Sequence, residues 1–400
     1  MWFSAVTALL STLPLLALTA PAAETSPIID FDAIIVGGGP AGLSALSALA
    51  RVRRRVLLVD SGVYRNGPTR HMHDVLGFDG VQPAYYRWAA RKQISFYNNA
   101  KTMNGTVTKI QPEKDKGFFT VSIKDTKGRE LPYLAKKVVL ATGLKDLLPA
   151  TPGISENWGK GIYWCPWCDG HEHADQALGL LGPLTSVPST VREILTLNKN
   201  IIAFVNGTDT PAQRAKTEEA SPKYLDYLKL HNVRIENRTI AAIERLANVS
   251  ETAGDPSLPT YPEHDSFLVN FTDGGSIRRD AFFVNFKSEQ ASTLGAELGV
   301  ETFGGRLGVD NSKGLVTSVP GVYAIGDCNS DNSTNVPHAL YSGKRTAVFL
   351  HVQLERETAN AELAALHSTA KRDLHERARQ VWDEVNGKPG DILYAGAYDG

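Results

Sequence analysis

The chain has 400 residues, of which 42% are hydrophobic and 21% charged, with 42 basic and 43 acidic side chains. This length predicts two or three domains, and the apolar content is ample for their cores. The net charge of -1 argues against a nucleic-acid partner, because phosphate binding needs a basic surface. With only three cysteines, the fold is not expected to depend on disulfides.

Residues 1–23 predict a signal peptide. They are apolar and uncharged, and Ala20-Pro21-Ala22 forms a small-residue cleavage site. The run is short for a membrane span, so an uncleaved signal anchor is the alternative. Glycosylation sequons begin at Asn104, Asn206, Asn237, Asn248, Asn270 and Asn332. Together these features predict secretion or residence in the lumen of the secretory pathway.

A dinucleotide-binding motif follows. Residues 31–36 predict a buried strand, residues 43–50 a helix and residues 56–59 a second strand that ends at Asp60. Between the first strand and the helix lies G-x-G-x-x-G, formed by Gly37, Gly39 and Gly42 with Pro40 and Ala41 inside it. Asp60 stands at the spacing of a carboxylate that holds a ribose hydroxyl. The motif predicts FAD or NAD binding without separating the two.

Each glycine of this motif has a physical task. Gly37 permits a tight turn, Gly39 lets a pyrophosphate approach the backbone, and Gly42 lets the helix lie close to the strand. The free N–H groups of the helix N-terminus then face the diphosphate.

Cys165 and Cys168 form a C-x-x-C pair, followed by Asp169. This spacing lets the two sulfurs close a small disulfide ring. A tetrahedral zinc site needs four ligands. With His171 and His173 nearby, zinc is one alternative and a purely structural disulfide is another. We interpret the pair as a redox-active dithiol.

The stretch after the dithiol looks like an incomplete second dinucleotide motif. A strand leads to Gly182, but Pro183 lacks an N–H donor and Leu184 stands where a second glycine is expected. We expect the Leu184 side chain to crowd a pyrophosphate. The next strand, residues 201–205, ends without an acid or arginines, and Arg214 is the nearest base. These residues predict that the second domain has lost its nucleotide.

Two further strands identify the family. Residues 138–143 end in Ala-Thr142-Gly143, and residues 320–327 end in Gly326-Asp327. With the first motif, in this order, they resemble the FAD domain of the two-dinucleotide-fold flavoprotein disulfide reductases. The resemblance implies FAD as the cofactor and assigns Asp327 to its ribityl chain.

The same resemblance implies an α/β fold of two Rossmann-like, three-layer dinucleotide-binding domains, the second inserted into the first. We expect the FAD domain in residues 27–148 and 283–355, and the dithiol domain in residues 149–282. Hinges are expected at residues 149–153 and near Asn285, and surface loops at 209–223 and 251–265. Residues 356–400 predict a helical extension, either exposed to solvent or serving as a dimer arm, since this family is usually homodimeric.

C-x-x-C-D-G resembles the active site of the low-molecular-weight thioredoxin reductases. There the dithiol domain swings over the flavin. The resemblance makes Cys168 the flavin-facing thiol, Cys165 the interchange thiol that meets the substrate, and Asp169 the acid that moves a proton for the thiolate.

The run from Gly326 to Ala339 is similar to the fungal dithiol oxidases of the gliotoxin and holomycin type. This similarity implies that His338 lies near the flavin ring or the dithiol, as a base or to steer oxygen, with Ala339 in the cofactor site. A histidine that opens a helix and is satisfied locally is the alternative. His71 and His73 fall in the loop that family members place beside FAD.

We therefore predict an FAD-dependent thiol oxidase that converts a small-molecule or peptide dithiol to a disulfide. Electrons pass to FAD and then to molecular oxygen, giving hydrogen peroxide. An NADPH-dependent disulfide reductase, a general protein-thiol oxidase and a catalytically silent flavin-binding scaffold are the alternatives. We expect no metal, no nucleic acid, no membrane contact beyond a possible signal anchor, and a homodimer.

Overall fold

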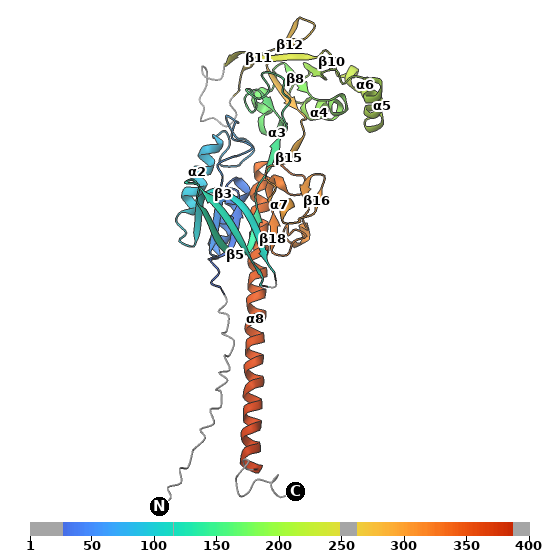
Figure 1. Ribbon diagram of the computed structural model, residues 1–400. Helices are drawn as coiled ribbons and strands as arrows, with labels where there is room; N and C mark the ends of the chain where they lie inside the picture. The colour runs from blue at the N-terminus through green and yellow to red at the C-terminus, as the bar shows by residue number, and fades with distance from the viewer. Residues whose placement is uncertain (1–26, 115, 249–261, 387–400) are drawn as a thin grey trace, which may run out of the picture.

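The computed structural model describes residues 27–114, 116–248 and 262–386. It contains two α/β domains, the second inserted into the first, and a long C-terminal helix that leaves the body of the molecule (Figure 1). The predicted signal peptide, residues 1–23, lies outside the described residues. Among the helices that are described, none is both long and apolar enough to cross a membrane.

The first domain is built on a six-stranded sheet of order β1-β2-β3-β4-β5-β18, in which β1 also pairs with β5. Its strands are β1 (Phe31–Val36), β2 (Val56–Asp60), β3 (Ala100–Glu113), β4 (Phe118–Asp125), β5 (Glu130–Leu140) and β18 (Val322–Ala324). The strands β2, β1, β5 and β18 run parallel. Their near-continuous apolar sequences suit this arrangement, because a parallel sheet is covered on both faces.

Two long strands give this domain its third layer. The first half of β3 pairs in parallel with β2, whereas residues 105–113 pair antiparallel with β4. Strand β5 likewise pairs antiparallel with β4 and then in parallel with β1. Ile34 of β1 packs toward this β-meander, and Ile35 packs toward the helices on the opposite face. The carboxyl ends of the parallel strands therefore meet at one edge, where the glycine turn after β1 lies.

Helices α1 (Pro40–Arg51) and α8 (Val336–Asn386) cover that opposite face. They cross closely at Gly343, where an added Cβ would lie 2.2 Å from the carbonyl oxygen of Ala41. The domain also holds α2 (Pro83–Ile94), α7 (Leu294–Glu297), β16 (Thr302–Phe303), β17 (Arg306–Leu307), η3 (Asn311–Lys313) and η4 (Gly326–Cys328).

The inserted domain repeats this plan around a parallel sheet of order β10-β9-β8-β14-β7. The strands are β7 (Ile162–Tyr163), β8 (Leu178–Leu181), β9 (Ile201–Phe204), β10 (Arg234–Glu236) and β14 (Ala281–Val284). Helices α4 (Val187–Ile194), α5 (Pro211–Ala220) and α6 (Tyr224–Leu230) and an antiparallel sheet of β11 (Ile240–Asn248), β12 (Asp265–Phe271) and β13 (Ser276–Arg279) complete it. The remaining short elements are α3 (Pro166–Asp169), η1 (His171–His173) and η2 (Leu184–Ser186).

The expected boundary between residues 282 and 283 is wrong, because it cuts through β14, a central strand of the inserted sheet. The chain instead returns to the first domain through β15 (Ser288–Gln290), which pairs antiparallel with β6 (Leu144–Asp146) on the outgoing path. This two-stranded ribbon connects the domains and adjoins the hinges predicted at residues 149–153 and near Asn285.

Both predicted surface loops need correction. Most of 209–223 is helix α5, whose first turn is capped by Thr210 through a hydrogen bond from the backbone N–H of Gln213. Its polar composition reflects a mostly exposed helix rather than a loop. In the second stretch, residues 251–261 lie outside the described residues, and Asp265 is a buried residue that begins β12.

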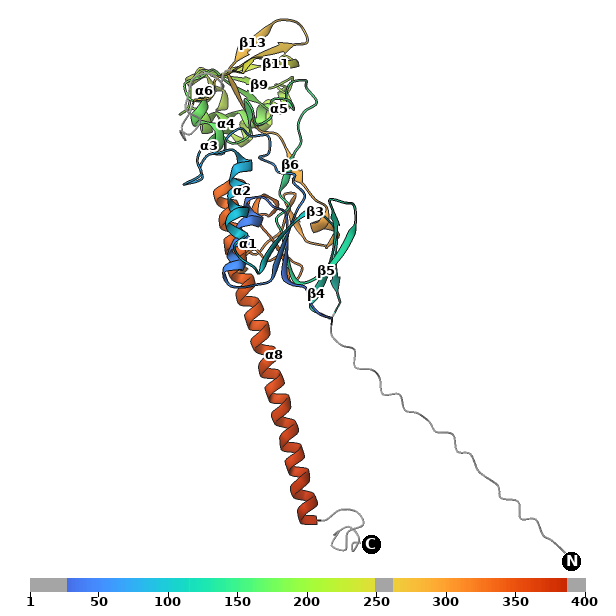
Figure 2. The same ribbon diagram turned by 90° about the vertical axis from the view of Figure 1, so that its left-hand side faces the viewer.

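The C-terminal extension does not begin at residue 356, because α8 is one continuous helix from Val336 to Asn386. Its first half packs on α1 inside the domain. Near Glu357, whose carboxylate lies 2.6 Å from Nζ of Lys137, the helix leaves the body and projects away from it (Figures 1 and 2).

Candidate active site

A cavity of about 520 Å³ extends from the glycine turn after β1 to the dithiol of the inserted domain. Gly37, Gly39 and Asp60 line one part of it, and Trp164 and Cys168 line another. Both domains therefore contribute walls. A site shared in this way can hold an elongated ligand against the sulfur pair.

The glycine turn has the geometry that a dinucleotide needs. Gly37 has φ of 118°, and an added Cβ would lie 2.2 Å from the carbonyl oxygen of Ala141. A Cβ on Gly42 would lie 2.0 Å from the carbonyl oxygen of Gly37. At Gly39, by contrast, a Cβ would meet no chain atom within 4 Å, because this residue faces the cavity.

The N-terminus of α1 is free to bind a diphosphate. Gly39 is its N-cap, Pro40 occupies its first turn, and no side chain of the described residues caps it. The first N–H groups of a helix lack partners within the helix and attract anions. Pro40 and Ala41 line the cavity, whereas Gly42 packs behind the turn. The cradle therefore fits the diphosphate of a dinucleotide.

Asp60 lies in the cavity wall at the end of β2. Its Oδ1 accepts a hydrogen bond from the backbone N–H of Gly62, and its Oδ2 accepts one of 2.6 Å from the Tyr64 hydroxyl and another from Arg91. These donors fix the carboxylate beside the glycine turn, where a ribose is expected.

The other residues predicted to hold FAD also come together. Thr142, Gly143, Gly326, Asp327 and Ala339 all line the cavity. Gly326 has φ of 67°, and an added Cβ would lie 2.9 Å from Cβ of Ala41.

Arg65 organises this part of the wall and was missed by the sequence analysis. Its guanidinium lies 2.9 Å from Asp327 and 2.6 Å from Asp146. Burial raises the pKa of Asp327 despite this ion pair. Arg65 also lies over the ring of Trp164, 5.3 Å from its centroid. No motif in the sequence distinguishes this arginine from its neighbours.

The dithiol sits at the start of α3 as a Cys165–Cys168 disulfide. Cys168 lines the cavity and Cys165 is not among the described residues that do so, as expected for a flavin-facing and an interchange sulfur. Both are half-buried, and the side chain of Trp167 between them is 70% exposed. A substrate thiol can therefore reach the pair from solvent.

Asp169 is a buried carboxyl in the cavity wall next to Cys168. Burial, with added repulsion from the carboxylates of Glu263 and Glu172, raises its pKa well above the usual range. The surroundings of Asp169 therefore favour its protonated form, which can supply a proton to a neighbouring thiolate.

Two glutamates beside it titrate differently. Burial raises the pKa of Glu172 to about 7. Burial opposes ionisation of Glu263 as well, but the hydrogen bond from His71 and the charge of Arg70 lower its pKa to about 2. Tyr163 also donates a hydrogen bond of 3.0 Å to Glu263. Glu172 therefore titrates near neutral pH, whereas Glu263 is ionised there.

The histidines divide into two groups. His71 and His73 line the cavity, in agreement with their expected place beside FAD. His338 does not belong to the described lining residues. Its Nε2 lies 2.8 Å from Asp331, and its backbone N–H is bonded to Asn335. These local contacts favour the alternative of a histidine satisfied at the start of α8, and a role beside the flavin stays a prediction.

The glycine turn of the inserted domain is closed by its own chain. The backbone N–H of Leu184 donates to the Thr208 hydroxyl at 3.0 Å, and that of Ser186 donates to the Pro183 carbonyl at 3.0 Å. The N–H of Val187 is bonded to the Leu184 carbonyl.

The expected steric role of Leu184 needs correction, since its side chain is fully buried in the core and does not point outward. The N–H groups of Leu184, Ser186 and Val187 are thus used inside the domain. Arg214, the nearest base, is held by Asp209 through contacts of 2.5 and 2.8 Å.

Zinc gains no support at the dithiol, because the two sulfurs are bonded to each other and His173 Nδ1 bonds the Asp169 carbonyl. Among the described residues, His173, Glu263 and Asp265 form one group with the spacing of metal ligands. Arg70 and Arg245 lie against these carboxylates and balance their charge, so we interpret the group as a salt-bridge network.

These features define a class of protein: a flavoprotein with two dinucleotide-type domains and a redox-active C-x-x-C. A profile of the pyridine nucleotide-disulphide oxidoreductase family matches residues 31–343. The chain belongs to this family and is a thioredoxin reductase-like, FAD-dependent oxidoreductase that acts on sulfur groups.

Individual relatives and a solved structure support the same family. A probable thioredoxin reductase of Arthroderma benhamiae is 48% identical over 359 residues, covering 89% of this chain and 86% of the relative. Thioredoxin reductase tcpT of Claviceps purpurea is 32% identical over 341 residues, covering 83% of this chain and 96% of the relative. The crystal structure of HlmI superposes with a TM-score of 0.69 at 28% identity, covering 85% of this chain and 97% of that one.

Proposed function

We propose that this protein is an FAD-dependent thiol oxidase, which converts a substrate dithiol and O₂ to a disulfide and H₂O₂. The observation that carries the proposal is the closed turn after β8, whose backbone donors are used by Thr208 and by its own carbonyls. Without a nicotinamide site, reducing equivalents enter through sulfur.

The chain's own residues support each sulfur step. A substrate thiolate attacks Sγ of Cys165, the sulfur away from the cavity, and releases Cys168 as a thiolate beside Asp169. The second substrate thiol then displaces Cys165 and leaves as the product disulfide. Attack by a thiolate and departure of the more stabilised thiolate are the general requirements of this exchange.

Proton handling follows from the two neighbouring acids. Asp169, whose pKa is raised, can donate a proton to the Cys168 thiolate when that charge develops in the cavity wall, and can take the proton back when Cys168 reacts as a thiolate. Glu172, with a pKa of about 7, exchanges protons near neutral pH. FAD bound in the cavity that Cys168 lines would supply a two-electron acceptor for the reduced Cys165–Cys168 pair, which closes to the disulfide again, and O₂ would take up the electrons as H₂O₂.

Anaerobic titration of the purified, flavin-loaded protein tests the proposal. Dithiothreitol and NADPH are added separately while the flavin absorbance band is followed. We expect bleaching by the dithiol and none by NADPH, followed on aeration by one H₂O₂ per disulfide. Bleaching by NADPH would establish the reductase alternative instead, and no response to dithiol would support a silent scaffold.

Substitution of the interchange sulfur gives the sharpest kinetic test. Cys165→Ser should lower dithiol oxidation by about a thousandfold or more, since a hydroxyl cannot take part in disulfide exchange. Bound flavin should be unchanged. Cys328→Ala is the matched control, because this third cysteine is fully buried and forms no disulfide. A Cys165→Ser variant with the wild-type rate would refute the scheme.

We further propose that the enzyme acts in the secretory pathway or outside the cell on a small-molecule or peptide dithiol. The apolar residues 1–23 and the sequons support this location. Asn206 and Asn237 are exposed, and their two sequons adjoin, since the backbone N–H of Gly207 donates to the Asn237 carbonyl. A mass shift on endoglycosidase treatment of the secreted protein is expected, and intracellular retention of the unmodified chain would contradict it.

A homodimer is a further proposal. The projecting part of α8 exposes Leu363, Leu366, Leu374 and Val381. Light scattering should give twice the chain mass. Truncation after Glu357 should give a monomer if the projecting part of α8 holds the dimer, and should leave the dimer intact if the two α/β domains hold it.

A further inference from the structure

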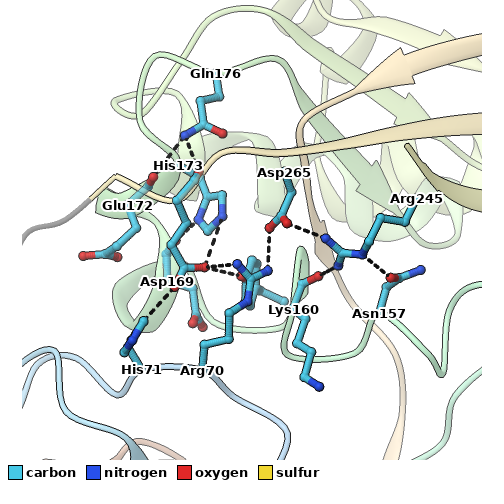
Figure 3. Close-up of polar contacts among 12 residues, drawn as sticks. Arg70, His71, Asn157, Lys160, Asp169, Glu172, His173, Gln176, Arg245 and Asp265 are labelled. Atoms are coloured by element: carbon cyan, nitrogen blue, oxygen red, sulfur yellow. Dashed lines mark hydrogen bonds and ion pairs between the residues drawn. The ribbon is translucent and has the colours of Figure 1, made fainter. Parts of the chain in front are cut away.

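One loop of the first domain reaches across to the inserted domain. It comprises residues 61–82, between β2 and α2, and we call it the bridging loop. Besides lining the cavity, it touches the inserted domain at several points on one side of the interface. Figure 3 shows Arg70 and His71 rising from this loop toward Asp265 and the segment around Asp169.

Arg70 makes the central contact. Its Nη2 lies 2.6 Å from Asp265 and its Nη1 3.0 Å from Glu263, both residues of the inserted domain. The three side chains are 18%, 1% and 6% exposed. Asp265 is fixed from within its own domain by Arg245 (Figure 3). Pulling Arg70 away would leave buried carboxylates short of a counter-charge, which is strongly unfavourable.

Neighbouring contacts hold the same orientation. His71 Nδ1 lies 2.9 Å from Glu263, and Arg65 stacks on Trp164. The backbones also approach closely at Gly159, where an added Cβ would lie 3.0 Å from the backbone nitrogen of Thr69. The β6–β15 ribbon connects the two domains covalently and can act as a hinge. The contacts of the bridging loop add polar interactions across the interface.

We propose that Arg70 is a positioning residue and that the bridging loop is a latch. The latch holds the inserted domain where Cys168 lines the FAD cavity, so dithiol and flavin react without rotation of that domain. Cys165 stays open to solvent in this same orientation, so substrate needs no rotation either. The inference rests on the part of the proposed function in which electrons enter through the dithiol.

An engineered cross-link reports the orientation directly. A Cβ at Gly159 would lie 3.3 Å from Cβ of Pro68, close to the separation of about 3.5–4.5 Å that a disulfide spans. In the flavin-loaded Pro68→Cys/Gly159→Cys variant, we expect rapid cross-linking by diamide, read by non-reducing peptide mass spectrometry. Adding Arg70→Met should slow cross-linking about tenfold, since a 1 Å displacement is enough for such losses. Equal cross-linking rates would overturn the latch.

Anaerobic stopped-flow reduction by dithiothreitol supplies the second readout. Arg70→Met should slow flavin reduction about tenfold without loss of bound flavin, and Arg70→Lys should restore part of the rate. Arg238→Met is the matched control, because Arg238 pairs with Glu236 inside the inserted domain and does not cross the interface. Its rate should stay within about twofold of wild type, since exposed ion pairs contribute little.

The double variant, joined through its two new cysteines by a short thioether cross-linker that dithiothreitol cannot cleave, tests the absence of rotation. We expect its flavin to be reduced at the rate of the single variant Pro68→Cys, which cannot cross-link. A locked protein whose flavin no longer responds to dithiol would show that rotation is required. Diamide supplies the oxidant for cross-linking, so the cross-linking rate does not depend on the protein's own dithiol oxidase activity. A wild-type protein that fails to oxidise dithiols would therefore refute the proposed function and leave the latch to be judged by cross-linking.

Discussion

The two glycine turns of this protein hold equivalent places in two related domains and differ in what their backbone N–H groups do. After β1, the turn opens on the cavity and the N-terminus of α1 has no side-chain cap. After β8, the donors of Leu184, Ser186 and Val187 are bonded to groups of the same domain. A dinucleotide-type fold therefore does not decide whether a dinucleotide binds. The decision lies with the donors that the turn leaves free.

The largest expected effect comes from blocking the open turn. Gly37→Val places a branched side chain at φ of 118° and a Cβ 2.2 Å from the Ala141 carbonyl oxygen. The turn must then shift, so we expect colourless protein without dithiol oxidation. The ratio of flavin to protein absorbance measures this loss.

The matched change in the closed turn is Gly182→Ala. Its Cβ would meet only the Ser186 hydroxyl, at 2.9 Å, which can rotate away. Flavin content and turnover should stay at wild-type values. If both glycine variants lost flavin equally, the two turns would not differ as described.

The next effect concerns the acid beside the sulfur pair. Asp169→Asn removes a proton donor, and we expect flavin reduction by dithiol to slow about 10²-fold or more. The rate at which an external dithiol reduces the Cys165–Cys168 disulfide should change less. Alkylation of the freed thiols measures this rate. A rate equal to wild type at all pH values would exclude Asp169 from proton transfer.

The same substitution has a consequence for stability. Because the folded state raises the pKa of Asp169, its stabilising contribution is complete in acid and is lost as pH rises above about 4 and through the folded pKa. Asp169→Asn should therefore gain stability relative to wild type as pH rises. Thermal unfolding at several pH values, followed by flavin fluorescence, measures the trend. A constant difference would contradict the raised pKa.

A smaller effect is expected at Thr208, whose hydroxyl bonds the turn after β8. Thr208→Val leaves the N–H of Leu184 without its acceptor and removes the hydroxyl that donates to Val205. The cost should be about 1–3 kcal/mol, visible as a lower Tm. Thr208→Ser keeps both the hydroxyl and the sequon at Asn206, and should keep the Tm. NADPH should still fail to bleach the flavin of Thr208→Val, since Pro183 offers no donor.

The smallest effect is expected at Arg214, the one base near the place of a nucleotide 2′-phosphate. Its guanidinium is exposed and already paired with Asp209. Arg214→Ala should change neither dithiol oxidation nor the lack of response to NADPH. A marked rise in the apparent Kd for NADPH, measured by fluorescence quenching, would show that a nucleotide does bind this domain.

Local patterns predicted much of the site because the chemistry there is carried by residues close in sequence. The glycines before α1, Cys168 with Asp169, and Gly326-Asp327 all fall on the cavity wall. Each motif is one turn, so its spacing fixes its shape. At His338 the local sequence supplies partners as well, because Asp331 and Asn335, a few residues away, bond its ring and its backbone N–H.

The sequence by itself determined the two dinucleotide-type domains, the FAD motif and the dithiol, because short-range spacing and strand hydrophobicity encode them. Only the tertiary structure decided where the Leu184 side chain points, that Thr208 seals the second turn, and that Arg70 meets Glu263 and Asp265 nearly 200 residues away. The physical reason is that a charge or a donor acquires its role from the partner that folding brings to it, and nothing in its immediate neighbours in the chain records that partner.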